Sequence, residues 1–135
     1  IQSQISKEGL PVRLLGWRRD SQNLLSASDI AINTSLNEGM PISIIQAQTL
    51  GIPAIVSDVG SSREIIQHGV TGYVLEYSDV VFAEKIKELI EDRRKLHQMS
   101  MNAHKVSMTK YSCNELAKRH TNLYEKLLFS NQAKI

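Results

Sequence analysis

The sequence predicts an α/β protein whose β-sheet is Rossmann-like and mainly parallel. Three observations lead to this fold class. Short apolar runs alternate with runs of helical periodicity, as in strands joined by crossover helices. Turn residues separate these runs, and a carboxylate, a glycine and a proline stand together at one strand-to-helix junction. With 135 residues, the chain is long enough to bury the core of one domain.

The strands are expected where short apolar runs rich in β-branched residues lie between turn signals. These runs occur at 12–15, 30–35, 53–57 and 72–75. Residues 1–9 precede the first run and are expected to form a linker or the end of a preceding helix.

Helices are expected between and after the strands, because capping residues mark their ends. Asp20 or Ser21 can cap a short helix, and Pro41 suits the first turn of the next, which Gly51 ends. Ser78 can cap a longer helix with apolar residues three to four positions apart. The expected helices span 21–26, 41–50 and 63–67, then a stretch from 79, one around 99–108 and one around 116–128.

Composition narrows the class of protein. The chain is 41% hydrophobic and 22% charged, and no apolar run approaches the roughly 20 residues that cross a bilayer. The single cysteine, Cys113, excludes an intramolecular disulfide and offers no pair of metal ligands. We therefore expect a cytoplasmic protein, with no metal site.

Charge is distributed unevenly along the chain. Residues 1–92 carry seven Lys and Arg against twelve Asp and Glu, whereas residues 93–135 carry nine against two. The basic part can be a solvated outer face, a surface for another domain, or a peripheral contact with anionic lipid at the inner membrane face. Nucleic acid is not an expected partner, because no binding motif or platform of aromatic residues accompanies the basic residues.

One strand-to-helix junction has the chemistry of a phosphate site. Glu38-Gly39-Met40-Pro41 follows the run at 30–35, and Gln46 lies about one turn into the following helix. The first N–H groups of a helix are unpaired and its dipole is positive there, so an anion is favoured. Glycine lets a ligand approach the backbone closely.

These residues resemble the nucleotide-sugar signature of retaining GT-B glycosyltransferases of the group 1, family 4 type. That signature is Glu-Gly-(Phe/Met/Leu)-(Gly/Pro), four residues, then a second Glu. Further similarity lies upstream and downstream, in the same order as in the family. The matching segments are Val12–Trp17, Gly51–Gly60, Arg63–Ile66 and Gly69–Val74, so the resemblance covers about residues 10–128.

The resemblance implies roles for particular residues. Glu38 would be the catalytic residue that faces the transferred sugar, or else only a carboxylate that caps the helix. The N–H groups of Gly39, Met40 and Ile42 would meet the diphosphate or sugar hydroxyls; Pro41 has no N–H and would only shape the turn.

Two further contacts with the nucleotide follow from the resemblance. Gln46 stands where the family has a glutamate that binds the ribose hydroxyls, and a neutral amide binds them less strongly than a carboxylate. Trp17 and Arg18 follow the segment that holds the base in the family. Gln46 could instead be a helix residue that faces solvent, and Trp17 could simply cover a small core.

The family comparison also predicts missing parts. The donor domain has strand order 3-2-1-4-5-6, and the run at 12–15 matches its third strand. Its first two strands and the acceptor-binding N-terminal domain have no counterpart. We expect residues 1–9 as linker or helix end, 10–128 as a partial nucleotide-sugar-binding domain, and 129–135 as a flexible tail.

The predicted function is donor binding for a retaining glycosyltransferase that moves a hexose to a glycan or lipid-linked acceptor, as in surface polysaccharide synthesis. A UDP-sugar is the expected donor, no cofactor is expected, and the chain alone should be inactive without the acceptor domain. The alternative is a non-catalytic nucleotide-sugar-binding or interaction module of the same fold. A related sugar-nucleotide epimerase is a weaker third possibility.

Overall fold

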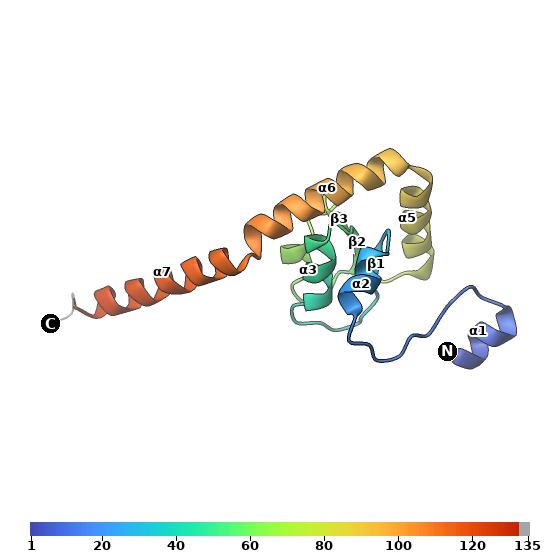
Figure 1. Ribbon diagram of the computed structural model, residues 1–135, viewed down its shortest axis with the longest axis horizontal. Helices are drawn as coiled ribbons and strands as arrows, with labels where there is room; N and C mark the ends of the chain where they lie inside the picture. The colour runs from blue at the N-terminus through green and yellow to red at the C-terminus, as the bar shows by residue number, and fades with distance from the viewer. Residues whose placement is uncertain (133–135) are drawn as a thin grey trace.

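The computed structural model describes residues 1–132 (Figure 1). Three strands and seven helices alternate along most of this part of the chain. The strands are β1 (Ala31–Asn33), β2 (Ala54–Ser57) and β3 (Gly72–Leu75). The helices are α1 (Gln2–Glu8), α2 (Ser21–Ser26), α3 (Ile42–Thr49), α4 (Ser62–Ile65), α5 (Asp79–Glu91), α6 (Arg93–Lys110) and α7 (Cys113–Gln132).

The sheet confirms the predicted fold class, because its strands are parallel and lie in the order β1-β2-β3. Ile55 in β2 pairs with Ile32 on one side and with Tyr73 on the other. Every residue of β2 and β3 is buried, as expected for strands covered by helices on both faces. Gly72 allows this close pairing, since a Cβ there would lie 2.1 Å from the Ala54 carbonyl oxygen.

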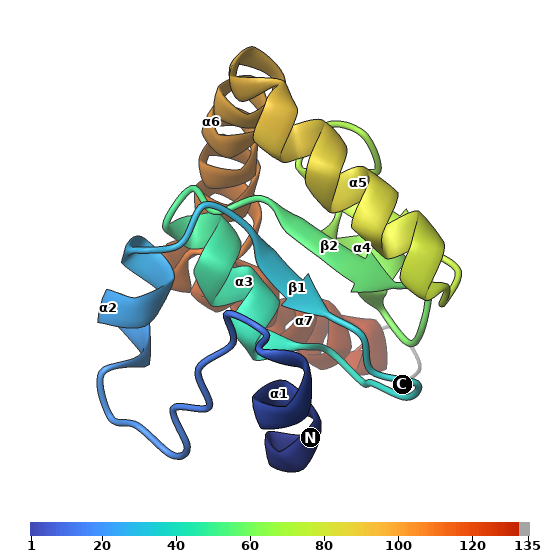
Figure 2. The same cartoon turned by 90° about the vertical axis from the view of Figure 1, so that its right-hand side faces the viewer.

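Helices cover both faces of the sheet, and Figure 2 shows α3 and α5 on opposite sides of it. Alternate strand residues point to opposite faces, so β2 and β3 supply two separate apolar clusters. On one face the cluster contains Ile55, Tyr73, Leu75, Phe82, Leu89, Leu96 and Met99. On the other it contains Ile44, Ala54, Val56, Ile65, Ile66 and Val74.

Helix α6 fastens the end of α3 through polar contacts. The Ser100 hydroxyl donates to the Gly51 carbonyl at 2.6 Å, and Nδ1 of His104 lies 2.6 Å from the Thr49 carbonyl oxygen. The hydroxyls of Thr49 and Ser107 are 2.8 Å apart. The first two contacts meet carbonyl groups at and just beyond the C-terminal end of α3, where intrahelical partners are lacking.

The predicted strand at 12–15 is wrong. Residues 10–20 form an irregular connection between α1 and α2 that stands away from the sheet (Figures 1 and 2). Val12, Leu14 and Leu15 are exposed, and no strand lies beside them in the part of the chain that the structure describes. Because a strand exists only by hydrogen bonding to a neighbour, apolar and β-branched residues alone do not make one here.

Two predicted boundaries also differ. The strand expected over 30–35 ends at Asn33, because the Asn33 side-chain oxygen accepts a bond from the Ser35 N–H at 2.9 Å and turns the chain. Helix α7 continues to Gln132, whereas the last helix is expected around 116–128. The rest of the expected tail, residues 133–135, lies outside the described residues.

Helix α7 projects away from the sheet in Figure 1. Its apolar side chains that the structure describes are exposed, including Leu116, Leu123 and Leu127. Among residues 1–132, no helix combines the length and apolar content needed to cross a bilayer.

A polar cluster joins β3 to α5 and α6. The carboxylate of Glu88 accepts bonds from the Tyr73 hydroxyl at 2.8 Å and the Lys85 ammonium at 2.7 Å, and it also accepts one from Lys95. Lys85, then Lys95 and Tyr73, lower the pKa of Glu88 to about 2. Both ammonium groups also lie over the Tyr73 ring, 5.0 and 5.6 Å from its centre.

We predict that this cluster makes the free energy of unfolding depend on pH in the acidic range. A carboxyl group whose pKa falls from 4.5 to about 2 on folding stabilises the fold fully above pH 4.5, and the contribution is lost as the pH drops toward 2. Glu88→Gln should lower the free energy of unfolding at pH 7 by about 1 kcal/mol, a low value because Glu88 is partly exposed. It should also flatten the pH dependence between 4.5 and 2, measured by urea unfolding.

The matched control is Glu84→Gln, because Glu84 lies on the same helix with an exposed side chain. That variant should keep the pH dependence of the parent chain. If the free energy of unfolding varied with pH in the same way for the parent chain and Glu88→Gln, Glu88 would not be the source of the pH dependence.

Candidate functional site

Glu38 lies just beyond the carboxyl end of β1, and two neighbours hold its side chain. The Ser35 hydroxyl donates to Oε1 of Glu38 at 2.8 Å, and the Asn33 amide donates to the same oxygen at 3.2 Å. Oε2 accepts no hydrogen bond from residues 1–132. The carboxylate is therefore fixed by one oxygen and keeps the other for a ligand.

These hydrogen bonds also keep Glu38 ionised. The Ser35 hydroxyl, then the Asn33 amide, lowers the pKa of Glu38, while partial burial opposes this. A carboxylate that accepts hydrogen bonds favours its charged form. At neutral pH the site therefore carries a negative charge beside the start of α3.

The backbone after Glu38 offers unpaired amides. Pro41 precedes α3, and no side chain caps the helix. Within residues 1–132, the N–H groups of Gly39, Met40, Ile42 and Ser43 have no hydrogen-bond acceptor. A Cβ added at Gly39 would meet no atom within 4 Å, so there is open space beside Gly39. They suit an anion at the positive end of the helix.

The turn after β2 supports this loop from behind. Gly60 has φ +53°, and a Cβ there would lie 1.9 Å from the Glu38 carbonyl oxygen. Ser61 donates to the Gly39 carbonyl twice, from its N–H at 3.1 Å and from its hydroxyl at 2.7 Å. The backbone of Glu38 and Gly39 is therefore positioned by contact with Gly60 and Ser61.

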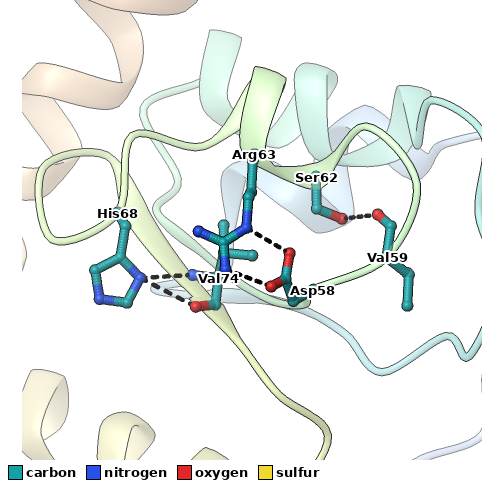
Figure 3. A network of polar contacts seen from close by, with 6 residues as sticks. All are labelled: Asp58, Val59, Ser62, Arg63, His68 and Val74. Atoms are coloured by element: carbon teal, nitrogen blue, oxygen red, sulfur yellow. Dashed lines mark hydrogen bonds and ion pairs between the residues drawn. The ribbon is translucent and has the colours of Figure 1, made fainter.

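Polar contacts of Asp58 and Ser62 stabilise that turn, and His68 contacts the backbone of β3, as Figure 3 shows. The Arg63 guanidinium donates to both oxygens of Asp58, one bond being 2.8 Å, and lowers the pKa of Asp58. The Ser62 hydroxyl donates to the Val59 carbonyl at 2.7 Å. Nδ1 of His68 lies 3.2 Å from the Val74 nitrogen and 3.0 Å from its carbonyl oxygen.

Gln46 lies one helical turn after Ile42 on α3, so both project from the same side of the helix. Both side chains are exposed, that of Ile42 to 66%. The next glutamine on the helix, Gln48, is fully buried and donates to the Thr71 hydroxyl at 3.0 Å. Gln46 is therefore accessible to a ligand, whereas Gln48 serves packing.

Trp17 and Arg18 lie in the irregular connection between α1 and α2. Trp17 is 81% exposed, with the Arg19 guanidinium 5.5 Å from its ring centre. Arg18 makes a two-point ion pair with Asp20 at 2.7 and 2.5 Å. In the described chain, no hydrogen bond or ion pair joins Trp17 or Arg18 to the loop that carries Glu38.

The residues that orient Glu38 are not among the predicted site residues. Asn33 and Ser35 lie in the run expected as a strand, although polar residues at the carboxyl end of such a run are the signal of a site in a parallel sheet. No local pattern could show that Ser61 binds Gly39, because these residues are 22 positions apart. Among residues 1–132, no three His, Cys, Asp or Glu side chains gather as metal ligands.

Residues 1–106 match the sequence family described as "Glycosyl transferases group 1". The chain belongs to this family. It is 37% identical over 89 residues, 66% of this chain, to the UDP-Gal:alpha-D-GlcNAc-diphosphoundecaprenol alpha-1,3-galactosyltransferase of Escherichia coli. It is 30% identical over 87% of its length to the N,N'-diacetylbacillosaminyl-diphospho-undecaprenol alpha-1,3-N-acetylgalactosaminyltransferase of Campylobacter jejuni. The chain spans only 23% and 31% of these two relatives.

Solved structures agree with the family. The Anabaena HepE protein in complex with UDP-glucose superimposes with a TM-score of 0.84 at 26% identity, covering 93% of this chain and 35% of that one. The same protein with UDP gives a TM-score of 0.86. The described parallel sheet is thus the C-terminal part of a GT-B fold, as the sequence predicts.

We predict that Gly60→Ala disturbs the loop of Glu38. A left-handed backbone costs a residue with a Cβ about 1–2 kcal/mol, and the overlap with the Glu38 carbonyl adds to this. Unfolding in urea should show a loss of at least about 1 kcal/mol, and the amide resonances of Glu38 and Gly39 should shift in nuclear magnetic resonance spectra.

Gly39→Ala is the matched control, because a Cβ at Gly39 meets nothing within 4 Å. It should change the free energy of unfolding by less than about 0.5 kcal/mol. A Gly60→Ala variant as stable as Gly39→Ala would show that the two turns do not constrain each other.

Proposed function

We propose that this chain binds a UDP-sugar as the donor domain of a retaining glycosyltransferase. The observation that carries the proposal is Glu38, whose Oε1 is held by Asn33 and Ser35 while Oε2 stays free. It stands beside the unpaired amides at the start of α3. The names of two matched proteins support the donor, since one uses UDP-Gal and the other was solved with UDP-glucose.

Glu38 acts on the sugar in this proposal. Its free oxygen accepts a bond from a sugar hydroxyl, and its negative charge favours the positive charge that develops at the anomeric carbon. Glu38 is the catalytic residue in this sense. No metal or cofactor is proposed for the step, because the backbone amides meet the diphosphate.

The other predicted residues complete the nucleotide site. The N–H groups of Gly39, Met40 and Ile42 donate to the diphosphate or sugar hydroxyls, and Pro41 orients them. Gln46, exposed one turn further along α3, accepts from the ribose hydroxyls. Trp17 and Arg18 contact the base; the exposed Trp17 ring supports this assignment.

The acceptor is proposed from the relatives' names. Two of them act on sugars linked to diphosphoundecaprenol, and another is a Vi polysaccharide biosynthesis protein of Salmonella typhi. We infer transfer of a hexose to a lipid-linked or glycan acceptor in surface polysaccharide synthesis, at the cytoplasmic side of the membrane. An N-terminal acceptor domain is the required partner, and the chain alone is inactive without it.

One observation favours a second function, a non-catalytic nucleotide-sugar-binding or interaction module. Gln46 replaces the second glutamate of the family signature. A module that only binds the nucleotide could tolerate the neutral residue. Because this chain has the signature residue Glu38 and two side chains that orient it, the catalytic function is the better supported of the two.

Titration of the chain with UDP-glucose and with UDP tests the role of Glu38. Glu38→Ala should weaken binding of UDP-glucose but not of UDP, because the carboxylate meets the sugar. In an enzyme that joins this domain to an acceptor domain, the same change should lower the transfer rate by a factor on the order of 10²–10³.

Asp29→Ala is the control, because this exposed carboxylate lies at the other end of β1. It should alter neither binding nor transfer. If the chain bound neither UDP nor UDP-glucose, the proposed function would be wrong. If Glu38→Ala left the transfer rate unchanged, Glu38 would not be catalytic, and only the non-catalytic binding module would remain.

We further predict that Gln46→Glu strengthens nucleotide binding. A carboxylate makes charge-assisted bonds with ribose hydroxyls that are about twice as strong as those of an amide. Because added repulsion of the diphosphate partly offsets this gain, the dissociation constant for UDP should fall by only about 1.5-fold to twofold, measured by calorimetry. Gln22→Glu on α2 adds the same charge at another exposed position and should leave the constant unchanged. If Gln46→Glu and Gln22→Glu changed the dissociation constant equally, Gln46 would not contact the ribose.

A further inference from the structure

A cavity of about 530 Å³ lies where α6 meets the start of α7. Its wall includes Val70, which lies two residues before β3 begins. The cavity is therefore near the amino end of the parallel strands, whereas Glu38 follows the carboxyl end of β1. The two places are at opposite edges of the sheet, so this cavity is separate from the nucleotide site.

The charged residues of the cavity wall carry a net positive charge. Lys105, Lys110 and Arg119 contribute three positive charges, and Glu115 contributes one negative charge. Nε of Arg119 donates to the Glu115 carboxylate at 2.8 Å, so these two groups largely neutralise each other. The Lys105 ammonium has no ion-pair partner among residues 1–132. An anion entering the cavity would therefore meet a net charge of the opposite sign.

Contacts within the fold hold the wall in place before any ligand arrives. The Lys110 ammonium donates to the Glu64 carbonyl oxygen, and the Tyr111 hydroxyl donates to the same oxygen at 3.0 Å. The Asn102 amide donates to the Val70 carbonyl at 3.3 Å. Groups that are already positioned lose little conformational freedom when they bind a ligand.

The cavity suits an organic anion better than a bare ion. Its volume lies within the range of about 300–1,000 Å³ that small-molecule sites occupy. Val70 and Val106 add apolar surface beside the cations. The side-chain amide of Gln67 also lines the cavity and can donate to phosphate oxygens, whereas the Thr109 hydroxyl already donates to the Lys105 carbonyl at 2.8 Å.

We propose that this cavity binds the phosphate group of an organic ligand, with Lys105 as its main contact. The ligand is either a soluble phosphorylated compound or the headgroup of an acidic phospholipid, since both present the same chemistry. The site is independent of the proposed nucleotide site and would give this domain a second ligand.

Binding to the full 135-residue chain tests the proposal with two probes. Sodium phosphate, titrated by calorimetry, represents the soluble source. Sedimentation with vesicles of equal parts phosphatidylglycerol and phosphatidylcholine, compared with phosphatidylcholine alone, represents the lipid source. Lys105→Glu should weaken binding of the effective probe about tenfold or more, because it replaces an attractive charge by a repulsive one. Added NaCl should weaken binding further.

The matched control is Lys118→Glu, which makes the same charge change at an exposed position of α7 outside the cavity wall. It should bind either probe within about twofold of the parent chain, because the charges there are screened by water and salt. Circular dichroism should show unchanged helix content for both variants.

The outcomes are distinct. Loss of binding in Lys105→Glu but not in Lys118→Glu supports the proposal, and the probe that binds identifies the source. Equal effects of the two changes, no effect of Lys105→Glu, or no binding of either probe would overturn it. UDP binding is measured separately and concerns the other edge of the sheet. A chain that binds no UDP would therefore not affect the conclusion about phosphate binding in this cavity.

Discussion

The contact between Gly60 and the backbone of Glu38 is the constraint on which the site depends. Two strand-to-helix turns meet there, one after β1 and one after β2, and they approach so closely that no Cβ fits between them. Parallel strands make this meeting possible, because their carboxyl ends lie at the same edge of the sheet. The pairing of β1 with β2 thus sets the position of the loop that carries Glu38.

From this constraint the electrostatics of the site follow. With its backbone fixed, Glu38 can receive two hydrogen bonds on one oxygen from Asn33 and Ser35 and still present the other. The same loop leaves the first amides of α3 unpaired. A negative carboxylate and several N–H donors therefore lie within one short segment. Such a segment can meet the hydroxyls of a sugar and the oxygens of a phosphate at the same time.

Sequence patterns predicted the parts of the fold that depend on local chemistry. The strand at 72–75 and the helix capped by Ser78 were correct, because burial and capping are written into neighbouring residues. The strand at 12–15 failed because pairing depends on a partner that lies elsewhere. Glu38 and Gly39 could be singled out from a short motif, whereas their support by Gly60 and Ser61 required the fold.

In the proposed site, Gln46 would change the strength of nucleotide binding and not its existence, because two effects oppose each other. Replacing a carboxylate by an amide gives up charge-assisted bonds to the ribose, worth about 1 kcal/mol relative to neutral ones. It also removes repulsion of the diphosphate, which at about 10 Å in water amounts to roughly 0.4 kcal/mol for each pair of charges. The lost hydrogen bonding is the larger effect, but only by a fraction of a kcal/mol for a doubly charged ligand. The amides at the start of α3 do not depend on Gln46, so in the proposed site the phosphate contacts would persist and the affinity for the nucleotide would be lower by less than about twofold.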